Sequence, residues 1–465
     1  MKCLSSWLDL AWLVTAILAI TLGWSQPLFA EGPSDVLAGI ETLDLPAAAR
    51  IALAGNPTAA AARERLLQAR QAVLQAYSAY FPTVNFNAAA SRVNLAANSQ
   101  QIQLLQALGS TTTEEAQDIY SASLTASWIL FDGFAREFTL AMARHGKRVS
   151  MAANDDVRRV LLQSVVGAFL NAQLALENIA IAKADEAFNQ RQLTEAKLRN
   201  AAGTGALSAV LNFQVRANSA ISDRIVAQRL YQTSRIALAA LLGLADAAMP
   251  ARIELSRLAP ATKDELAPPD LTHLLEAAQN RRPDLQQGQW AVRLAAADVK
   301  VQRANYYFPT LALSATYAGE RYDDKDFEED DFGDTVAISL TYNLFAGGLF
   351  KAQHQEAKAR LREAEKSRQA VKLNIAAEVR ATAARVSSAQ QQLLLQRANA
   401  DLVKRNRDLV EKEYKAGVGS LVRLNEAQRD LTRASVSLTN ARAALHQAAY
   451  DLQSATGQIL NTFGQ

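Results

Sequence analysis

The phrase Tyr80-Phe81-Pro82-Thr83 returns in the second half of the chain as Tyr307-Phe308-Pro309-Thr310. Each copy closes an Ala-rich stretch with helical periodicity and opens a stretch in which apolar and polar residues alternate. Proline cannot continue a helix, and it pushes the residue before it toward an extended conformation. One copy alone would be equally compatible with an ordinary helix-to-strand loop. The repetition instead predicts two designed junctions, at Pro82 and Pro309, where helix gives way to strand.

Four stretches have the alternation of a β-strand, and they cover about 82–93, 119–131, 309–320 and 334–345. Apolar residues lie on one face of each stretch, and Ser, Thr or Asn lie on the other. Their length suits a tilted outer-membrane strand, which needs about 9–11 residues. The aromatic residues beside the two prolines suit a membrane–water interface. We therefore expect Leu124, Leu130, Leu313 and Leu340 to face lipid, and Ser123, Ser314 and Ser339 to face a wet lumen.

Each pair of predicted strands leads into two long helices, at about 133–201 and 207–243 and again at about 347–416 and 421–456. The first would be on the order of 100 Å long at 1.5 Å per residue, which is unlike a helix of a globular domain. Gly133 and Gly347 mark the strand exits. Apolar ladders seven residues apart, such as Leu395, Leu402 and Leu409, indicate helices that touch neighbours on more than one side.

The two halves of the chain are related by a nearly constant offset. The junction prolines are 227 residues apart (309 − 82), whereas the glycines Gly203 and Gly417 are 214 apart (417 − 203). The difference falls between the two strands of each pair, where a loop tolerates insertion. The sequence therefore predicts two structural repeats, 31–245 and 271–465, joined by a proline-containing linker at 246–270.

The N-terminus, residues 1–30, has the pattern of a signal peptide, with Lys2, an apolar run and a cleavage site ending at Ala30. An N-terminal membrane anchor is the alternative. The only cysteine, Cys3, lies inside this segment, so we expect no disulfide and no thiolate metal site in the mature chain. No later segment approaches 18 continuous apolar residues, which leaves strands as the expected means of crossing a membrane.

Composition and motifs exclude several classes of function. A formal charge of +3 over 465 residues gives no indication of nucleic-acid binding. The four histidines are isolated, and no nucleophile elbow, phosphate loop or dinucleotide fingerprint is present, so we predict neither an enzyme nor a cofactor. The acidic tract Asp323–Asp331 is either a solvated loop or a cation site, although it lacks the glycine and terminal glutamate of a calcium loop.

Physical constraints on the strands demand assembly. Four strands cannot close a barrel, because about eight is the lower limit, and open strand edges are not tolerated in lipid. Several copies must therefore pool their strands into one barrel, and the long helices would continue its hollow wall. A soluble periplasmic coiled-coil scaffold is the competing hypothesis, but it leaves the amphipathic strands unexplained.

The duplicated layout, the Tyr-Phe-Pro-Thr junctions, the Leu-Phe-x-Gly strand exits and the Gly-x-Gly helical breaks together resemble the TolC-like outer-membrane efflux protein family, over about 46–460. The resemblance implies a mainly α fold with membrane β-strands, in which a homotrimer forms a 12-stranded β-barrel continuous with a periplasmic α-helical barrel. It implies an exit duct of a tripartite efflux or type I secretion system in the outer membrane of a Gram-negative bacterium. The implied partners are a periplasmic adaptor (membrane fusion) protein and an inner-membrane transporter of RND, ABC or MFS type. Small-molecule efflux and secretion of proteins or peptides both remain open.

The resemblance also implies functional roles for the helical breaks. Adaptor docking is expected at Gly203, Thr204, Gly205 and Leu207 in the first hairpin and at Gly417, Val418, Gly419 and Leu421 in the second. Arg423 and Glu426 are the expected periplasmic gate. The chain departs from the family pattern here, because Ala209 and Arg423 stand where relatives often have aspartate. A less anionic entrance is therefore expected.

Overall fold

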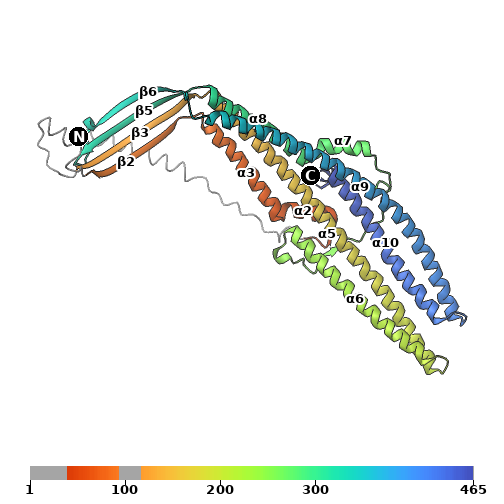
Figure 1. Ribbon diagram of the computed structural model, residues 1–465. Helices are drawn as coiled ribbons and strands as arrows, with labels where there is room; N and C mark the ends of the chain where they lie inside the picture. Colours follow the sequence, from red (N-terminus) through yellow and green to blue (C-terminus); the bar gives the residue numbers. More distant parts are fainter. Residues whose placement is uncertain (1–38, 94–116, 464–465) are drawn as a thin grey trace, which may run out of the picture.

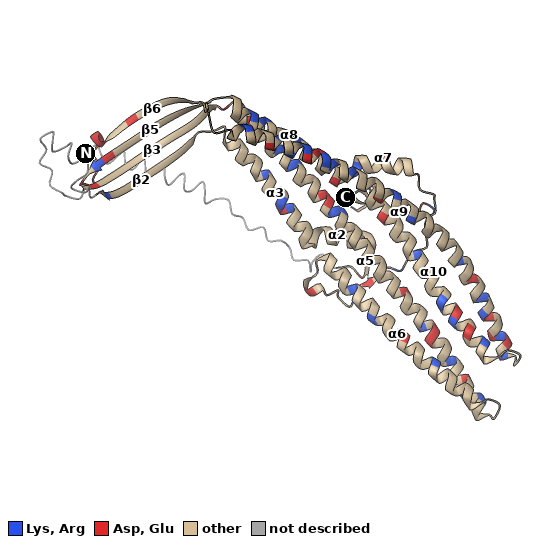
Figure 2. Ribbon diagram, in the orientation of Figure 1, with Lys and Arg blue, Asp and Glu red and all other residues tan. Residues whose placement is uncertain are grey.

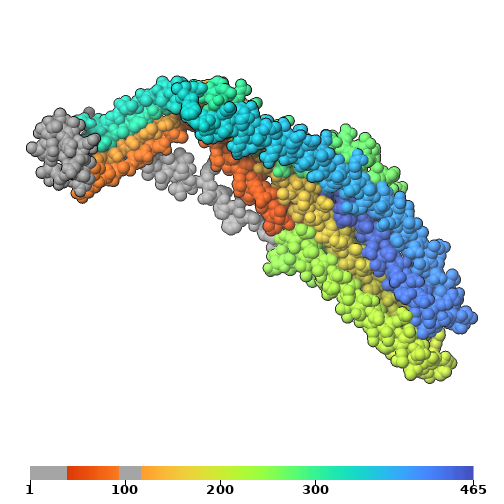
Figure 3. All heavy atoms as spheres, viewed as in Figure 1, coloured from red at the N-terminus to blue at the C-terminus, as the bar shows by residue number. Residues whose placement is uncertain are grey.

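The computed structural model describes residues 39–93 and 117–463 of the chain. The molecule is long and curved, with a β-sheet at one end and long helices running away from it (Figures 1 and 3). The predicted signal peptide and nearly all of the loop between the first two strands lie outside the described residues.

The sheet is four-stranded and antiparallel, in the order β2-β3-β5-β6. Its strands are β2 (Thr83–Val93), β3 (Gln117–Phe131), β5 (Thr310–Tyr322) and β6 (Phe332–Thr341). The prediction for the fourth strand was wrong at its end, because β6 stops at Thr341 rather than at residue 345. Thr341 pairs with Thr310, the first residue of β5, so β6 has no partner strand beyond that point. Leu344 and Phe345 lie past it and are 88% and 86% exposed.

The register confirms that the sheet has one apolar and one polar face. Leu124 pairs with Phe86 on one side and with Tyr317 on the other, and Ile338 pairs with Leu313. On the opposite face, Thr125 pairs with Thr316, and their hydroxyl oxygens lie 3.3 Å apart. Paired residues of antiparallel strands share a face, so the apolar strips of all four strands merge into one surface.

A β-bulge changes the expected role of Leu130. Ile129 pairs with Ala312 and Phe131 pairs with Leu311, so Leu130 is the extra residue between them. The expectation that Leu130 continues the apolar face was therefore wrong, and Phe131 takes that place. Alternation alone could not show this, because a bulge shifts the pairing by one residue without changing the sequence pattern before it.

The long helices form a wall one helix thick. They are α3 (Pro57–Ser78), α5 (Ala135–Ala201), α6 (Leu207–Leu242), α8 (Pro283–Tyr307), α9 (Leu349–Lys415) and α10 (Leu421–Ala455). Near the sheet the neighbours run α3-α5-α8-α9, and farther away they run α6-α5-α10-α9 (Figure 1). One edge of the wall is therefore α3 and α6, and the other edge is α9.

One described helix, α5, contains an 18-residue window apolar enough to cross a bilayer by composition. About half of that window (44%) is buried inside the chain. Leu162, Val165 and Phe169 of α5 belong to the largest hydrophobic core, which explains the apolar character without a membrane.

Small elements surround the middle of the wall. They are β1 (Thr42–Leu43), α2 (Leu45–Gly55), β4 (Glu254–Leu255), α7 (Leu271–Arg281) and α11 (Ile459–Phe463). β1 pairs with β4 in parallel. Strand β4 lies within the predicted linker 246–270, and Ile253, Leu255 and Leu258 of that segment are buried in the same core as α5. The segment is thus packed against the helices and is not a free spacer.

Candidate functional site

The two junctions between helix and sheet lie where the repeated phrase predicts them. Pro82 and Pro309 immediately precede β2 and β5. Exposed aromatic side chains gather there, among them Tyr77, Phe81, Tyr307 and Phe308. Tyr77 contacts both Tyr80 and Phe81, with ring centroids 5.6 and 5.7 Å apart. This arrangement is the belt that a membrane–water interface favours.

The glycines at the strand exits have the backbone conformation that glycine permits. Gly133 has φ +67° and Gly347 has φ +62°. Gly133 also packs directly against the Phe308 ring, leaving no room for a Cβ atom. The segment that leaves β3 therefore packs against the helix-to-strand junction that precedes β5.

Arg136 organises the first junction, and the sequence analysis missed it. Its guanidinium donates to the carbonyl oxygens of Ile129 and Leu130, at 2.7 and 3.1 Å, and these carbonyls belong to the bulge. It also pairs with Asp132, and the two side chains are each 13% exposed. A bulge disrupts the ladder locally, and a carbonyl that loses its strand partner there takes another donor, here Arg136. The Asp-x-x-x-Arg spacing at a helix start was the available signal, but the bulge that uses it could not be seen.

The two helical hairpins are α5–α6 and α9–α10, and at both tips the first helix ends with the same pattern of backbone hydrogen bonds. In the first, Gly203 N–H donates to the Asn200 carbonyl and Thr204 N–H donates to the Arg199 carbonyl, at 3.0 Å each. In the second, Gly417 and Val418 donate to the Tyr414 and Glu413 carbonyls, at 3.1 Å each. This is the Schellman motif, which needs a left-handed residue, and φ is +75° at Gly203 and +79° at Gly417.

The second glycine of each tip is needed for a different reason. A Cβ atom at Gly205 would lie 2.9 Å from the Arg199 Cβ, and one at Gly419 would lie 2.8 Å from the Tyr414 backbone nitrogen. The Gly-x-Gly pattern is thus accounted for by the turn itself. What remains for a partner is the exposed surface of the tips, where Leu207 is 60% and Val418 is 81% exposed.

A small hydrophobic core joins the two hairpins just above their tips. Phe188 from α5, Phe213 from α6, Val410 from α9 and Leu424 from α10 are buried in it. Phe213 and Leu424 are fully buried. All four helices therefore contribute, and the tips of one chain are packed together.

Polar side chains add a second connection between the hairpins. The Asp185 carboxylate of α5 accepts hydrogen bonds from Gln428 Nε2 at 2.7 Å and Thr432 Oγ1 at 2.9 Å, both on α10. Nearby, Asn425 of α10 donates to Asn212 of α6 at 3.1 Å. These three contacts place α10 against both helices of the first hairpin.

The predicted gate residues lie on the first turns of α10, and both are exposed. Arg423 pairs with Glu413 of α9, at 3.5 Å, and the two side chains are 63% and 45% exposed. The partner carboxylate therefore belongs to the same hairpin. An exposed pair of this kind contributes about 0–1 kcal/mol.

Figure 2 shows acidic residues at the end of the sheet remote from the helices. The side chains of the acidic tract Asp323–Asp331 are organised around Arg321. Its guanidinium pairs with Asp324, Glu328 and Asp331, at 3.3, 3.1 and 3.0 Å. Within residues 39–93 and 117–463, no group of three or more His, Cys, Asp or Glu side chains is arranged to hold a metal ion. The arginine takes the central place that a cation would need.

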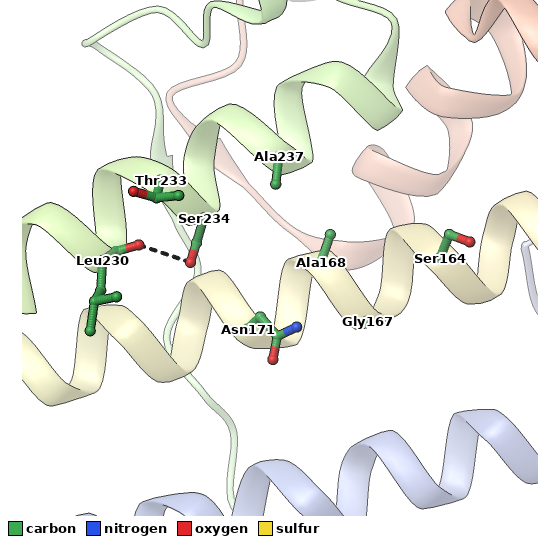
Figure 4. A pocket seen from close by; sticks show the side chains of 8 residues that line it. All are labelled: Ser164, Gly167, Ala168, Asn171, Leu230, Thr233, Ser234 and Ala237. Carbon is green, nitrogen blue, oxygen red and sulfur yellow. Dashed lines mark hydrogen bonds between the residues drawn. The ribbon is translucent and has the colours of Figure 1, made fainter.

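Figure 4 shows a groove between α5 and α6 in the middle of the wall. It is lined by Ser164, Gly167, Ala168, Asn171, Leu230, Thr233, Ser234 and Ala237. The Ser234 hydroxyl donates to the Leu230 carbonyl within its own helix, at 2.9 Å. Most of these lining residues are small, and none of them is charged.

Comparison with known proteins matches this architecture to a family. The sequence profile described as "Outer membrane efflux protein" matches residues 48–244 and 274–458. The pyoverdine export outer membrane protein OpmQ of Pseudomonas aeruginosa is 25% identical over 408 residues, covering 87% of this chain and 83% of its own. The protein CyaE of Bordetella pertussis is 27% identical over 345 residues, covering 72% and 70%.

Solved structures agree on the fold. The outer membrane protein VceC of Vibrio cholerae superimposes with a TM-score of 0.73 at 19% identity, covering 89% of this chain and 96% of its own. A membrane protein of Pseudomonas aeruginosa gives 0.74 at 21% identity, covering 93% and 97%.

The fold is that of TolC-like outer-membrane channels. The chain belongs to the outer membrane efflux protein family. It is accordingly an outer-membrane exit duct for efflux or type I secretion, with a large periplasmic helical part. The alternative of a soluble periplasmic scaffold was wrong.

Proposed function

We propose that three copies of this chain close into one duct, with a 12-stranded barrel in the outer membrane. The support is that the described sheet has two open edges, β2 and β6, and one continuous apolar face. Val84, Phe86, Val336 and Ile338 near those edges are 63–71% exposed. In lipid every strand edge needs a partner, and β6 of one copy can pair with β2 of the next.

The helical wall supports the same head-to-tail arrangement. Its α9 edge carries Leu395, Leu402 and Leu409, which are 70%, 65% and 59% exposed. Its α6 edge carries Leu211 and Val215, which are 58% and 65% exposed. Each edge continues the strand edge on its own side, β6 with α9 and β2 with α3 and α6. A single rotation about the duct axis would therefore cover the strand edges and both apolar ladders together.

The hairpin tips are the proposed docking surface for a periplasmic adaptor, and Arg423 and Glu426 are the proposed lining of the mouth. The support is their exposure at the end remote from the sheet. An inner-membrane transporter of RND, ABC or MFS type would supply energy, because nothing in the described part of the chain suggests an energy source of its own.

Small-molecule export is the first hypothesis for the cargo, since a relative aligned over 87% of this chain is named for pyoverdine export. A relative named "Alkaline protease secretion protein AprF" aligns over 52%, so protein secretion is the alternative.

Cysteine crosslinking tests the assembly directly, because the only native cysteine is Cys3. Pairs of cysteines, one in β2 and one in β6, should form disulfides between chains and give a ladder that ends at three chains. The matched control is Ser123→Cys with Ala318→Cys, which pair across β3 and β5 within one chain. The control should crosslink without raising the mass. A ladder that ends at two chains, or a native mass of one chain, would overturn the proposed trimer.

A further inference from the structure

Residues 249–267, which we call the strap, lie between the two repeats. They cross the four helices of the wall on the side remote from the sheet, α6, α5, α10 and α9. One side chain from each helix donates to the strap's backbone carbonyls: Arg235 of α6 to Pro250 at 2.9 Å, Gln173 of α5 to Ser256 at 2.7 Å, His446 of α10 to Ala259 at 3.0 Å, and Gln390 of α9 to Glu265 at 2.8 Å. The strap meets the helices in their spatial order, α6, α5, α10 and α9. It therefore connects the two hairpins.

Among these four donors, His446 is the one whose charge changes near neutral pH. Its Nδ1 lies 2.5 Å from the Glu265 carboxylate, and its Nε2 lies 3.0 Å from the Ala259 carbonyl oxygen. The His446 and Glu265 side chains are only 9% and 15% exposed. A neutral imidazole has a single N–H, so it cannot donate to both oxygens, whereas an imidazolium can.

We propose that His446 and Glu265 form a pH-sensitive clasp that fastens the strap to the second hairpin when His446 is protonated and loosens when it is not. The clasp is also part of the strap's local structure. The other Glu265 carboxylate oxygen accepts from Thr262 N–H at 2.8 Å, which orders the turn 262–265. Loss of the ion pair would therefore weaken the strap's attachment and its internal turn together.

The surrounding charges set the direction of the response. Glu265 from the strap stabilises the imidazolium, Arg442 of α10 opposes it, and Gln390 from α9 is neutral. Tyr450 of α10 also lies in the field of Glu265. Burial on its own lowers the His446 pKa, but the hydrogen bonds to Glu265 and Ala259 outweigh it, and the His446 pKa is raised. Burial likewise works against ionised Glu265, but its bonds to His446 and Thr262 leave the Glu265 pKa lowered.

The stability that the clasp gives to the strap should fall as pH rises, because the His446 pKa is raised in the folded chain. A group with a raised folded-state pKa contributes stability that is complete below its unfolded value, about 6.5 for histidine, and is lost as pH rises through the folded value. Within that window the protection of the strap should fall up to about tenfold per pH unit. Glu265 acts in the opposite direction only at acidic pH, where its carboxylate becomes protonated.

Hydrogen–deuterium exchange on the assembled protein tests the clasp. The measured quantity is the protection factor of the strap amides at Thr262, Glu265, Leu266 and Ala267, at pH values from 6 to 9 after correction for intrinsic exchange. In the parent it should fall as pH rises. His446→Gln, which keeps one donor but does not titrate, should give a flat profile.

Gln390→Ala is the matched control, because it removes a strap contact without removing the titrating group. It should lower protection at every pH while keeping the parent's slope. A flat profile in the parent, which needs no variant to fold, would overturn the clasp. So would a His446→Gln profile with the parent's slope.

Discussion

Arginine substitution at the middle of β6 tests which face of the sheet meets lipid. Val336 is halfway along β6, lies on the apolar face opposite Ala315, and is 69% exposed in the single chain. The next residue, Ala337, pairs with Ser314 on the polar face. Val336→Arg and Ala337→Arg therefore place the same charge at nearly the same depth but on opposite faces.

The expected cost is large on one face only. An arginine facing lipid near the midplane of a membrane barrel costs about 2–4 kcal/mol, and about 0–1 kcal/mol near the interfaces. In the proposed trimer the midplane cost would be about 6–12 kcal/mol per assembly. Leu340, the apolar residue singled out from the sequence, is next to the end of β6, so its arginine variant should behave as an interface case.

The assay is the yield of heat-resistant oligomer extracted from outer membranes, with the thermal midpoint of what assembles. Val336→Arg should give little oligomer, Ala337→Arg nearly the parental yield, and Leu340→Arg an intermediate yield. Equal yields for Val336→Arg and Ala337→Arg would refute the assignment of faces.

Three further changes test the junction and the tips. Arg136→Met should lower the thermal midpoint, because each lost bond to a bulge carbonyl costs about 1.5–3 kcal/mol; an unchanged midpoint would remove Arg136 from the junction. Gly417→Trp should abolish transport while leaving oligomer yield intact, since φ is +79° and the tip is exposed; retained transport would argue against docking there. Arg423→Ser should raise single-channel conductance at low salt, because it removes a long, exposed, charged side chain from the proposed lining of the mouth where its charge is least screened; a conductance equal to the parent's would remove Arg423 from the gate.

The elements most open to prediction were those specified locally. Pro82 and Pro309 end helices by covalent geometry, and Gly203 and Gly417 supply the left-handed residues of the tips. The local conformation at these positions therefore follows from the residue type alone. The alternation within each strand likewise determined which side chains share a face, except at the bulge in β3.

Features that depend on distant partners could not be predicted. β6 ends at Thr341 because β5 begins at Thr310, and the bulge at Leu130 exists only relative to β5. The strap looked like a linker because its prolines are local, whereas the side chains that bind it come from four separate helices. Asp185 gave no signal at all, since its donors on α10 are more than 240 residues away.

Asp185 provides the test of whether the two hairpins are held together near their tips. Its carboxylate accepts from Gln428 and Thr432 of α10 and from Asn189 of its own helix. Hydrogen bonds to a charged acceptor are worth about 1.5–3 kcal/mol each, and the lower figure suits this half-buried group. Asp185→Ala leaves the Gln428 and Thr432 donors without that acceptor. The free energy holding α10 to α5 should therefore fall by about 3 kcal/mol, which is two crossing bonds at about 1.5 kcal/mol each. We expect hydrogen exchange of α10 near residues 424–432 to accelerate more than tenfold, with the oligomer intact.

Glu186→Ala on the next residue is the matched control. It removes a pair with Arg224 inside the first hairpin and should leave exchange of α10 unchanged. Unchanged exchange of α10 in Asp185→Ala would mean that the hydrophobic core at Phe213 and Leu424, and not Asp185, joins the hairpins. Equal acceleration in both variants would mean that the effect is not specific to the Asp185 hydrogen bonds.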